Sequence, residues 1–466
     1  MYKLNYFNFD KKSGKFLLTN DLGKYTFVEA NILDRIIKKE ELPKNLENDL
    51  LEKKFIYKED DEIFAQESAK YVRSQKNYLF LAPSLHIFVV TKNCNYRCIY
   101  CQAGNLNQQN KYNMDIETAK KSVDIALSSP SKNLTFEFQG GEPLLNFEII
   151  KYIVEYSKSI CKDKHIEYNI VTNLSLLTDD MISFIKDNNI AISTSLDGNS
   201  KLQNTNRPYP NNDSYDATLK GLNRLKEHGL NPSAIQTTTK YSLDQYKEIV
   251  DEYVEQGYTG IFIRPLTQLG KADKNWDTIG YSAEEYLLFY KNILEYIIDL
   301  NVNKNINISE RHTALFLKKI MDNFPANYME LRSPCGGVLG QIAYYNNGDV
   351  YTCDEARMLG EMGDDIFKIG NVNDLSYEKI INSPTTDALS VSSCIECLSK
   401  CHNCVYSPYC GTCPVINYAQ ENNIFSRIPN NYRCKIYKGM IDIIFDYLNK
   451  NDEKVIEIFN RWINED

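Results

Sequence analysis

Three closely spaced cysteines are the residues of this chain best suited to chemistry. Cys94, Cys98 and Cys101 follow the apolar run LHIFVVT, with three residues between the first two and two between the last two. Thiolates at this spacing could hold three corners of a [4Fe–4S] cube. No fourth cysteine follows nearby, so one iron would remain open to chelate a small molecule. A zinc site is the alternative, although zinc prefers four ligands and paired Cys-x2-Cys motifs.

A second group of cysteines occupies the C-terminal third. Of the thirteen cysteines, nine lie beyond position 334, three lie near position 100, and Cys161 stands alone. This clustering favours metal or cluster ligation over the dispersed disulfides of a secreted protein. The pairs Cys394-x2-Cys397 and Cys401-x2-Cys404 keep zinc ribbons as an alternative for this segment.

Alternating strand-like and helix-like runs must position the first cysteines. Strand-like runs cover 85–91, 134–138, 166–172, 190–196, 233–239 and 259–265, and helix-like runs lie at about 115–129, 147–162, 178–188, 214–229 and 242–256. Plausible N-caps are Asp115, Asn146, Thr178 and Ser242. Repeated strand–helix units predict a parallel sheet with right-handed crossovers, and six units fall short of a closed eight-unit barrel. Ligands of such sheets bind at the carboxyl ends of the strands.

Polar loops follow the first four strands at that edge. The Cys94 loop comes first, and after it come Gln139-Gly140-Gly141-Glu142-Pro143, then Asn173, then Ser195 and Asp197. Glycines let the backbone approach a ligand closely. The Asn, Ser and Asp side chains could hydrogen-bond a ligand, and Arg207 could pair with a carboxylate. Local turns and a solvated arginine are the alternatives.

Three features of the chain resemble radical S-adenosylmethionine (SAM) enzymes. They are the cysteine motif, Tyr100 before its third cysteine, and the GGEP segment. In that family the open iron binds the amino and carboxylate groups of SAM, and the barrel is a six-unit (β/α)6 partial TIM barrel. The resemblance implies a SAM-binding cluster on Cys94, Cys98 and Cys101. The implied cofactor-binding residues are Tyr100, Gln139, Gly140, Gly141, Glu142, Pro143, Asn173, Ser195, Asp197 and Arg207.

The C-terminal cysteines resemble the SPASM extension of radical SAM enzymes, which binds auxiliary [4Fe–4S] clusters. The resemblance implies three [4Fe–4S] clusters in all, with auxiliary ligand sets of Cys401, Cys404, Cys410 and Cys434, and of Cys335, Cys353 and Cys413. Two residues separate Cys410 from Cys413, where the family has three. Some relatives supply a fourth ligand where this chain has Gln341. Cys394, Cys397 or an open iron are the alternatives here.

Asp354 directly follows Cys353. In sulfatase-maturing relatives an aspartate at this point is implicated in taking a proton from the substrate, so the resemblance implies a catalytic Asp354. A carboxylate between clusters could serve as a general base. A supporting hydrogen bond or a turn is the alternative role.

Composition limits the partners of the chain. Its 466 residues carry a formal charge of −9 with a pI of about 5.4. This balance argues against nonspecific binding to nucleic acid or to an anionic membrane. No apolar run approaches the ~20 residues that span a bilayer, and the N-terminus lacks a signal-peptide pattern. We expect a cytoplasmic protein with no nucleic-acid or membrane partner.

The chain is long for a single core, and we expect five parts. Residues 1–80 suit a small α+β, winged-helix-like unit, which could bind a leader peptide as an added strand or only cap the barrel. Residues 84–280 form the partial barrel, 281–334 a helical bridge, 335–437 the cysteine-rich SPASM domain, and 438–466 a C-terminal helix.

As a whole the chain resembles radical SAM/SPASM peptide maturases, most of all those of the His-Xaa-Ser system, in stretches such as SLHIFVVTKNCNYRCIYCQ and VYSPYCGTCPVINYAQ. The resemblance implies a ribosomal precursor peptide as substrate and a flavodoxin or ferredoxin as electron donor. It also implies a 5′-deoxyadenosyl radical that abstracts hydrogen, so that a crosslink, thioether or epimer forms. A formylglycine-generating sulfatase maturase is the second hypothesis. A noncatalytic iron–sulfur protein that transfers electrons is the third.

Overall fold

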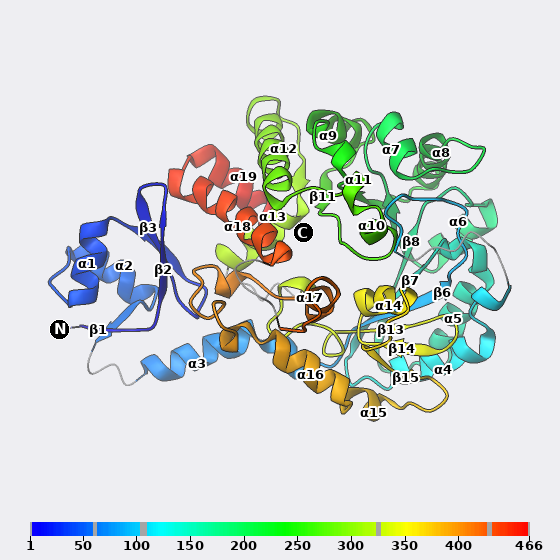
Figure 1. Ribbon diagram of the computed structural model, residues 1–466, viewed down its shortest axis with the longest axis horizontal. Coiled ribbons are helices and arrows are strands. Elements are labelled where there is room, and N and C mark those ends of the chain that lie inside the picture. Colours follow the sequence, from blue (N-terminus) through cyan, green and yellow to red (C-terminus); the bar gives the residue numbers. More distant parts are fainter. Residues whose placement is uncertain (1, 59–62, 103–109, 323–327, 426–430, 465–466) are drawn as a thin grey trace.

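The computed structural model describes residues 2–58, 63–102, 110–322, 328–425 and 431–464. The N-terminal unit lies at one end of an elongated molecule and the barrel lies at the other (Figure 1). The cysteine-rich segment and the last two helices fill the space between them. In the part of the chain that the structure describes, no helix combines the length and apolar character needed to cross a bilayer.

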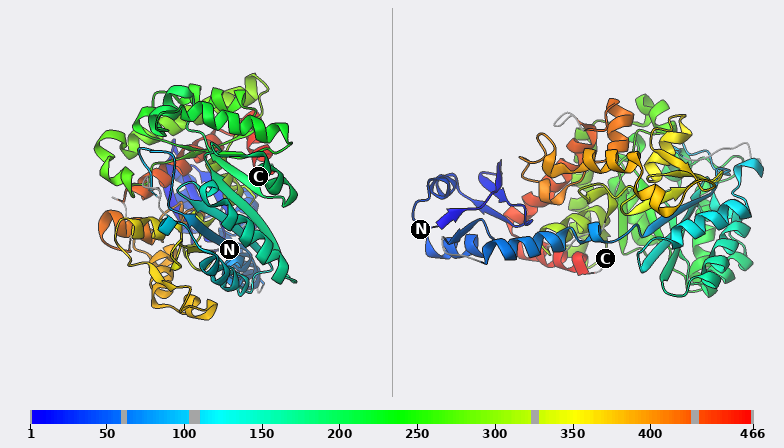
Figure 2. Two further views of the ribbon diagram at one scale, coloured as in Figure 1. Left: turned by 90° about the vertical axis from the view of Figure 1, so that its right-hand side faces the viewer. Right: turned by 90° about the horizontal axis from the view of Figure 1, so that it is seen from below.

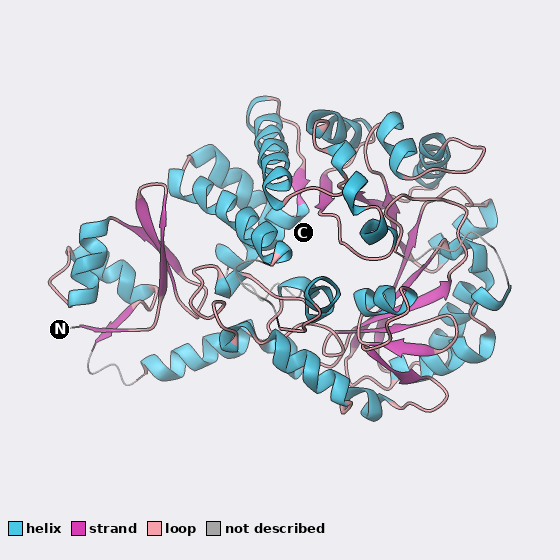
Figure 3. Cartoon of the chain, in the orientation of Figure 1, coloured by secondary structure: helices cyan, strands magenta, loops and turns pink. Residues whose placement is uncertain are grey.

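The barrel strands belong to one ten-stranded sheet, in the order β12-β11-β10-β9-β8-β7-β6-β13-β14-β15. Strands of this sheet appear as magenta arrows in the right-hand half of Figure 3. Six neighbouring parallel strands follow the chain in order: β6 (Leu85–Thr91), β7 (Asn133–Gly140), β8 (His165–Thr172), β9 (Ala191–Ser195), β10 (Ser233–Thr237) and β11 (Gly260–Arg264). The short β12 (Ser309–Glu310) pairs in parallel with β11. The six predicted strands and their parallel pairing are confirmed.

Helices link these strands. Four of them bury their apolar faces in a core that includes Phe88, Phe136 and Ile150, namely α4 (Ile116–Leu127), α5 (Phe147–Ile160), α6 (Asp179–Asp187) and α8 (Ser214–Glu227). The other two, α7 (Ser200–Asn206) and α9 (Tyr246–Glu255), bury Leu202 and Tyr253 in a second core.

Local cap signals predict two of the four helix starts in detail. The Asp115 and Thr178 side chains cap α4 and α6 as expected. Asn146 precedes α5, but its side chain donates to the Val90 carbonyl (2.8 Å) and so ties the helix to β6. The prediction of Ser242 as a cap is wrong, because α9 begins four residues later, at Tyr246. Ser242 instead accepts a hydrogen bond from the Thr239 amide (3.0 Å) and closes a short 3-10 turn.

The C-terminal unit continues the barrel sheet. β13 (Gln341–Tyr344) pairs in parallel with β6, and β14 (Asp349–Tyr351) and β15 (Lys368–Asn371) extend it as antiparallel strands. At this seam the buried His86 ring stacks on Tyr344, with Nδ1 3.1 Å from the hydroxyl. The helices of this unit are α14 (Asp354–Glu361), α15 (Tyr377–Ile381), α16 (Pro384–Ser393) and α17 (Pro414–Glu421).

A helical layer joins the barrel to the C-terminus. It consists of α10 (Lys271–Lys274), α11 (Trp276–Ile279), α12 (Ala283–Asn303), α13 (Arg311–Ile320), α18 (Tyr432–Lys450) and α19 (Glu453–Asn464). α12 packs on α18 and α19 around Tyr290, Phe445 and Trp462. One helix is expected after Cys434, whereas the structure has two, and the first already contains Cys434.

The N-terminal unit has a core of its own, which includes Leu18, Ile36 and Phe55. Its elements are β1 (Tyr2–Leu4), β2 (Asn8–Lys12), β3 (Lys15–Thr19), β4 (Tyr25–Val28), α1 (Ala30–Lys38), α2 (Lys44–Glu52) and β5 (Ile56–Lys58). β2, β3 and β4 form an antiparallel meander, and β1 pairs with β5. α3 (Phe64–Gln75) runs from this unit toward the barrel, as the view from below shows (Figure 2).

Candidate active site

A cavity of about 280 Å³ opens at the carboxyl ends of the barrel strands, and we call it the barrel pocket. The predicted residues that line it are Cys94, Cys98, Tyr100, Cys101, Gln139, Gly140, Gly141, Glu142, Asn173, Ser195 and Arg207. Further walls come from Thr237, from the segment 264–267, and from Arg357 and Met358 of α14. The predicted convergence of four loops at one edge is therefore confirmed. The ligands of these residues stay predictions.

Burial raises the pKa of two thiols of the first motif, Cys94 and Cys98. It is the main reason that the pKa of Cys94 lies well above its usual range and that of Cys98 is raised to about 12. The neighbouring thiols add to both shifts, so the three sulfurs lie within electrostatic range of one another. Cluster irons bind thiolates and would reverse these shifts with release of protons. The set therefore suits a cationic cluster better than a reactive free thiol.

The glycine loop packs directly against the cysteine loop. The Gly141 amide donates to the Thr91 carbonyl (2.9 Å), and the Glu142 amide donates to that of Asn93 (2.8 Å). A Cβ atom on Gly141 would lie 2.2 Å from the Asn93 carbonyl oxygen and 2.9 Å from Cys94 Cβ. Only glycine fits at this position while the two loops keep their contact.

Glu142 joins this loop to the end of β8. Its buried carboxylate accepts hydrogen bonds from the Thr172 hydroxyl (2.6 Å) and from the Asn173 amide (2.9 Å). Burial raises the pKa of Glu142 to about 7, although these donors oppose the shift. Asn173 in turn donates to the Asn95 side chain (2.9 Å) in the cysteine loop.

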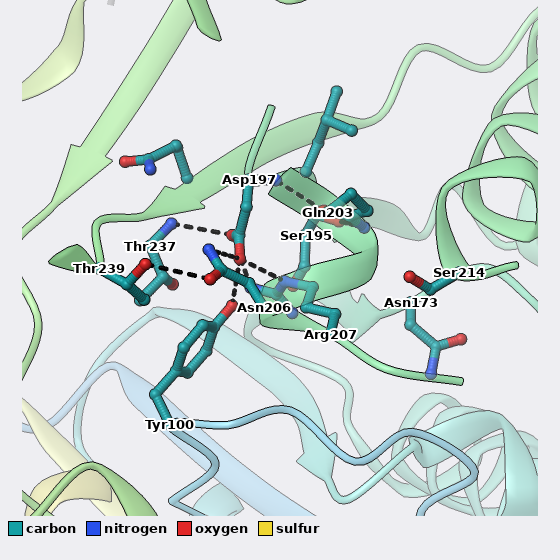
Figure 4. Close-up of polar contacts among 12 residues, drawn as sticks. Tyr100, Asn173, Ser195, Asp197, Gln203, Asn206, Arg207, Ser214, Thr237 and Thr239 are labelled. Carbon is teal, nitrogen blue, oxygen red and sulfur yellow. Dashed lines mark hydrogen bonds and ion pairs between the residues drawn. The ribbon is translucent and has the colours of Figure 1, made fainter. Parts of the chain in front are cut away.

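Asp197 holds two residues of the pocket wall in place (Figure 4). Its carboxylate is fully buried and accepts from the Tyr100 hydroxyl (2.6 Å), Arg207 Nη2 (3.2 Å), Asn206 Nδ2 (3.1 Å) and the Thr237 amide (3.1 Å). Of the predicted cofactor-binding residues, Asp197 and Pro143 are not among the described residues that line the barrel pocket. In this structure Asp197 therefore positions Tyr100 and Arg207 from behind the wall.

The auxiliary cysteines form two separate sets. The first, Cys401, Cys404, Cys410 and Cys434, lines a small cavity of about 50 Å³. Burial and the other thiols of this set raise the pKa of Cys401 and of Cys434 to about 12. The second set, Cys335, Cys353 and Cys413, belongs to one apolar cluster beside β13. This division matches the two ligand sets implied by the sequence resemblance.

Cys394 and Cys397 face each other, with 3.8 Å between their sulfurs. Cys394 also contacts Glu396, which pairs with Lys76 of the N-terminal segment. In the described part of the chain, no three His, Cys, Asp or Glu side chains lie close enough to share one metal ion.

Asp354 begins α14, and the Cys353 sulfur caps this helix by accepting from the Ala356 amide (3.4 Å). The Asp354 carboxylate pairs with Arg357 Nη2. Arg357 is 1% exposed, and among the described residues its Nε and Nη1 atoms have no hydrogen-bond partner. The sequence analysis missed Arg357, because a single arginine three residues after Asp354 has no distinctive spacing.

A charge network that begins at the pocket wall also escaped the sequence analysis. Arg264, at the end of β11, pairs with Glu330 (2.6 Å), and Arg433 lies 3.6 Å from the same carboxylate. Arg433 also donates to the Gly411 carbonyl (2.7 Å), and it acts electrostatically on both Cys410 and Cys413. One cation therefore lies between the two auxiliary sets.

Two protein-family descriptions match the chain. The radical SAM superfamily matches residues 88–241, and the SPASM iron–sulfur cluster-binding domain matches residues 335–414. These ranges hold the first cysteine motif and all but Cys434 of the auxiliary sets.

Three known proteins illustrate the relationship. An uncharacterised protein of Methanocaldococcus jannaschii is 30% identical over 63% of this chain and 90% of its own length. A serine-type anaerobic sulfatase-maturating enzyme of Bacteroides thetaiotaomicron is 26% identical over 80% of this chain and 92% of its own. The radical SAM cyclopropyl synthase TigE of Paramaledivibacter caminithermalis is 24% identical over 84% of this chain and 79% of its own.

Two solved structures share the fold. anSMEcpe with bound AdoMet superposes with a TM-score of 0.68 at 20% identity, over 81% of this chain and 99% of its own. Streptococcus suis SuiB bound to precursor peptide SuiA gives a TM-score of 0.56 at 17% identity, over 92% and 99%. The family matches show that this chain belongs to the radical SAM superfamily, a class of enzymes that catalyse radical reactions with SAM and [4Fe–4S] clusters, and that it carries a C-terminal SPASM domain.

Proposed function

We propose that this enzyme modifies a ribosomally made precursor peptide. The observation that carries the proposal is the composition of the barrel pocket, where SAM-type loops face Arg357 of α14, a helix that starts directly after Cys353. A substrate in this pocket would lie between the first cluster and an auxiliary cluster. The precursor peptide bound to SuiB supports a peptide substrate. Within this class we assign the chain to the His-Xaa-Ser maturases, on the sequence resemblance described above.

The residues of the pocket fit the cofactors of the family. Cys94, Cys98 and Cys101 would hold the SAM cluster, and the two auxiliary sets would hold the others, for three clusters in all. Bound SAM and its cluster supply a 5′-deoxyadenosyl radical that abstracts hydrogen, once a flavodoxin or ferredoxin has supplied the electron. The glycine backbone at 140–141 allows close approach of the ligand, and Asn173, Ser195 and Arg207 offer polar contacts to it.

Next to Arg357 of the opposite wall, Asp354 would accept the proton that the substrate loses, at the carboxylate that Arg357 orients. The ion pair with Arg357 holds this carboxylate in one orientation. In the described part of the chain, Nε and Nη1 of Arg357 have no hydrogen-bond partner, which leaves them as two further donors for oxygen atoms of the peptide.

The proposal can be tested with a short peptide encoded beside the gene. Anaerobically reconstituted enzyme, SAM and a reductant should change the mass of this peptide and form 5′-deoxyadenosine. Changing Cys94, Cys98 and Cys101 together to alanine should remove about four irons and abolish both products. SAM cleavage that survives in this triple variant would contradict the assignment of the cluster. Changing Cys404 to alanine should block the peptide product but leave uncoupled SAM cleavage.

We also propose that the N-terminal unit binds the leader of the precursor by strand addition. β2 is an edge strand of the meander, and its Phe9, Asp10 and Lys11 side chains are exposed. Successive amides of an edge strand alternate between the neighbouring strand and the outside. Of the variants Phe9→Pro and Asp10→Pro, the one that removes an outward-pointing amide should weaken precursor binding without loss of thermal stability. The variant that removes an amide bonded to β3 should also weaken the pairing of β2 with β3. Unchanged affinity in both variants would show that the unit only caps the molecule.

A sulfatase maturase is the second candidate, and the position of Asp354 beside Cys353 favours it, as does the relative from Bacteroides thetaiotaomicron. Under this alternative, a sulfatase-derived peptide with serine or cysteine at its centre should be oxidised to formylglycine. Mass spectrometry of this peptide, run beside the precursor peptide, decides between the two candidates.

A further inference from the structure

Cys394 and Cys397 are a pair of thiols that belong to neither auxiliary set. The turn between them brings their sulfurs to 3.8 Å, and the Cys397 amide donates to the Cys394 carbonyl (2.9 Å). An S–S bond is about 2 Å long, so the sulfurs need to approach each other by less than that length. Among the described residues, no third His, Cys, Asp or Glu side chain completes a metal site with them. The pair therefore suits chemistry between two thiols better than the binding of zinc or of a cluster, which need more ligands.

The two thiols differ in their exposure. Cys397 is exposed, whereas Cys394 is half-buried at the end of α16, where its sulfur donates to Glu396 Oε2 at 3.4 Å. A reagent that arrives from solvent therefore reaches Cys397 first and finds the second sulfur directly behind it. An accessible thiol beside a resolving thiol is the arrangement that reversible disulfides require.

The turn also anchors the segment that leaves the N-terminal unit. Glu396 pairs with Lys76, the residue after α3, and accepts from the Ser333 hydroxyl. The Lys76 ammonium and the Tyr78 hydroxyl both donate to the Ser333 carbonyl (2.7 and 2.9 Å). Because the Cys394 thiol donates to the same Glu396 carboxylate, a chemical change at Cys394 acts directly on this junction.

We propose that Cys394 and Cys397 form a reversible redox site that passes between dithiol and disulfide, with a small disulfide such as glutathione disulfide as the oxidant. The Cys397 thiolate attacks one sulfur of the oxidant, so that a mixed disulfide forms and one thiol leaves. Cys394 then attacks the Cys397 sulfur, forms the internal disulfide and releases the second thiol. Two electrons pass from the pair to the oxidant, and the two thiol protons end on the two released thiols.

The oxidised pair has no S–H group left to donate to Glu396. Oxidation therefore removes one hydrogen bond from the carboxylate that holds Lys76, and it loosens the anchor of the N-terminal segment. Disulfides of this reversible kind are the ones that occur in reducing compartments, where they act as redox sensors. The inference depends neither on the substrate nor on the auxiliary clusters.

The test uses the full chain, reconstituted anaerobically with its clusters. Trypsin releases residues 380–400 as one peptide, in which Cys394 and Cys397 are the only cysteines. After treatment with glutathione disulfide and alkylation of the remaining thiols, mass spectrometry should find this peptide with an internal disulfide and without alkyl groups, while the iron content stays constant. Dithiothreitol should restore alkylation at both cysteines. In Cys394→Ser, Cys397 should end as a mixed disulfide with glutathione, whereas in Cys397→Ser the half-buried Cys394 should react far less.

A pair that stays open to alkylation in excess glutathione disulfide would overturn the inference. Loss of iron in step with disulfide formation would also overturn it, because the two cysteines would then be cluster ligands. The same holds for zinc that is present in the parent protein and absent when both cysteines are changed to serine. Hydrogen exchange of the amides in segment 76–80 should rise on oxidation of the parent and stay constant in the double serine variant. Unchanged exchange in the oxidised parent would overturn the link between the disulfide and the junction.

Discussion

Two buried carboxylates, Glu142 and Asp197, fix the geometry of the barrel pocket at the scale of single residues. Each accepts hydrogen bonds from groups on different loops, so the cost of burying a charged group is offset by several donors. Tyr100 and Asn173, which line the barrel pocket, are placed by acids that the sequence analysis assigned to the ligand itself. Asn, Asp and Glu at strand ends are therefore ambiguous in a sequence, because the same oxygen atoms serve a loop or a ligand equally well.

Gly141→Ala should weaken the binding of SAM to the barrel pocket. Its new Cβ would meet the Asn93 backbone at 2.2 Å, and because backbone atoms cannot turn away, the cysteine loop must shift. Overpacking of this kind costs about 1–3 kcal/mol, so SAM affinity measured by calorimetry should fall about tenfold or more. Gly260→Ala is the control, since its nearest neighbour is the Ser309 hydroxyl at 3.3 Å, which can rotate. Equal SAM affinity in both variants would contradict this account of the loop.

At the scale of elements, local signals predicted what lies close in the chain. The strand patterns and the caps Asp115 and Thr178 act within a few residues, so six barrel strands and two helix starts were predictable. The pairing of β13 with β6 was not, because it joins distant segments such as Leu85 and Gln341 without any local pattern. The two auxiliary thiol sets came from the family resemblance, and their roles as cluster ligands stay predictions. Single charged residues such as Arg433 have no spacing signal, so their role appears only once the fold brings partners together.

The N-terminal strands also support a cysteine loop, which the sequence did not indicate. The buried Thr19 hydroxyl donates to the Val405 carbonyl (2.6 Å), and Asn8 donates to the carbonyls of His402 (2.9 Å) and Cys404 (3.2 Å). β2 and β3 are therefore hydrogen-bonded to the segment that carries Cys401 and Cys404. A unit proposed to bind the leader peptide thus contacts an auxiliary ligand set directly.

Thr19→Val should loosen this auxiliary set without changing the shape of the side chain. The Val405 carbonyl would stay buried without its donor, at a cost of about 1–3 kcal/mol. We expect faster loss of iron from the reconstituted protein to a chelator, followed by absorbance. Ser13→Ala is the matched control, because the Ser13 hydroxyl bonds Asp446 at an exposed position of the same hairpin. If both variants release iron at the rate of the parent, the N-terminal unit does not stabilise this loop.

At the scale of the whole molecule, one carboxylate joins three parts of the chain. Glu330 lies in the bridge, Arg264 ends the barrel strand β11, and Arg433 belongs to α18 beside the auxiliary cysteines. Although burial opposes its ionisation, the two arginines hold the pKa of Glu330 well below its usual range. The barrel and the SPASM unit are thus coupled by a buried charge network as well as by the shared sheet.

Glu330→Gln should be destabilising, because it leaves the buried Arg433 and the partly buried Arg264 without their counter-charge. Breaking a fully buried pair from one side costs about 3–5 kcal/mol, and the partial exposure of this network places the loss, measured by urea unfolding of the cluster-free protein, at the lower end of that range. Asp163→Asn removes the exposed pair with Lys132 and should cost less than about 1 kcal/mol. Similar losses in the two variants would mean that the network contributes no more than a surface ion pair.

Acid should lower the free energy of unfolding through two histidines that are buried beside barrel strands. His86 lies at the junction of β6 and β13, and His312 contacts the Ile263 carbonyl (3.0 Å) beside β11. Burial lowers the pKa of each to about 3, whereas the unfolded chain titrates near 6.5. Between these values the unfolded state binds more protons, so the free energy of unfolding falls as the pH is lowered from about 6.5 toward 3.

Each histidine should contribute a slope of about 1.4 kcal/mol per pH unit to this pH dependence. In urea unfolding between pH 7.5 and 5, His86→Gln should reduce the acid slope by this amount. An unaltered slope in His86→Gln would mean that His86 is already protonated in the folded protein.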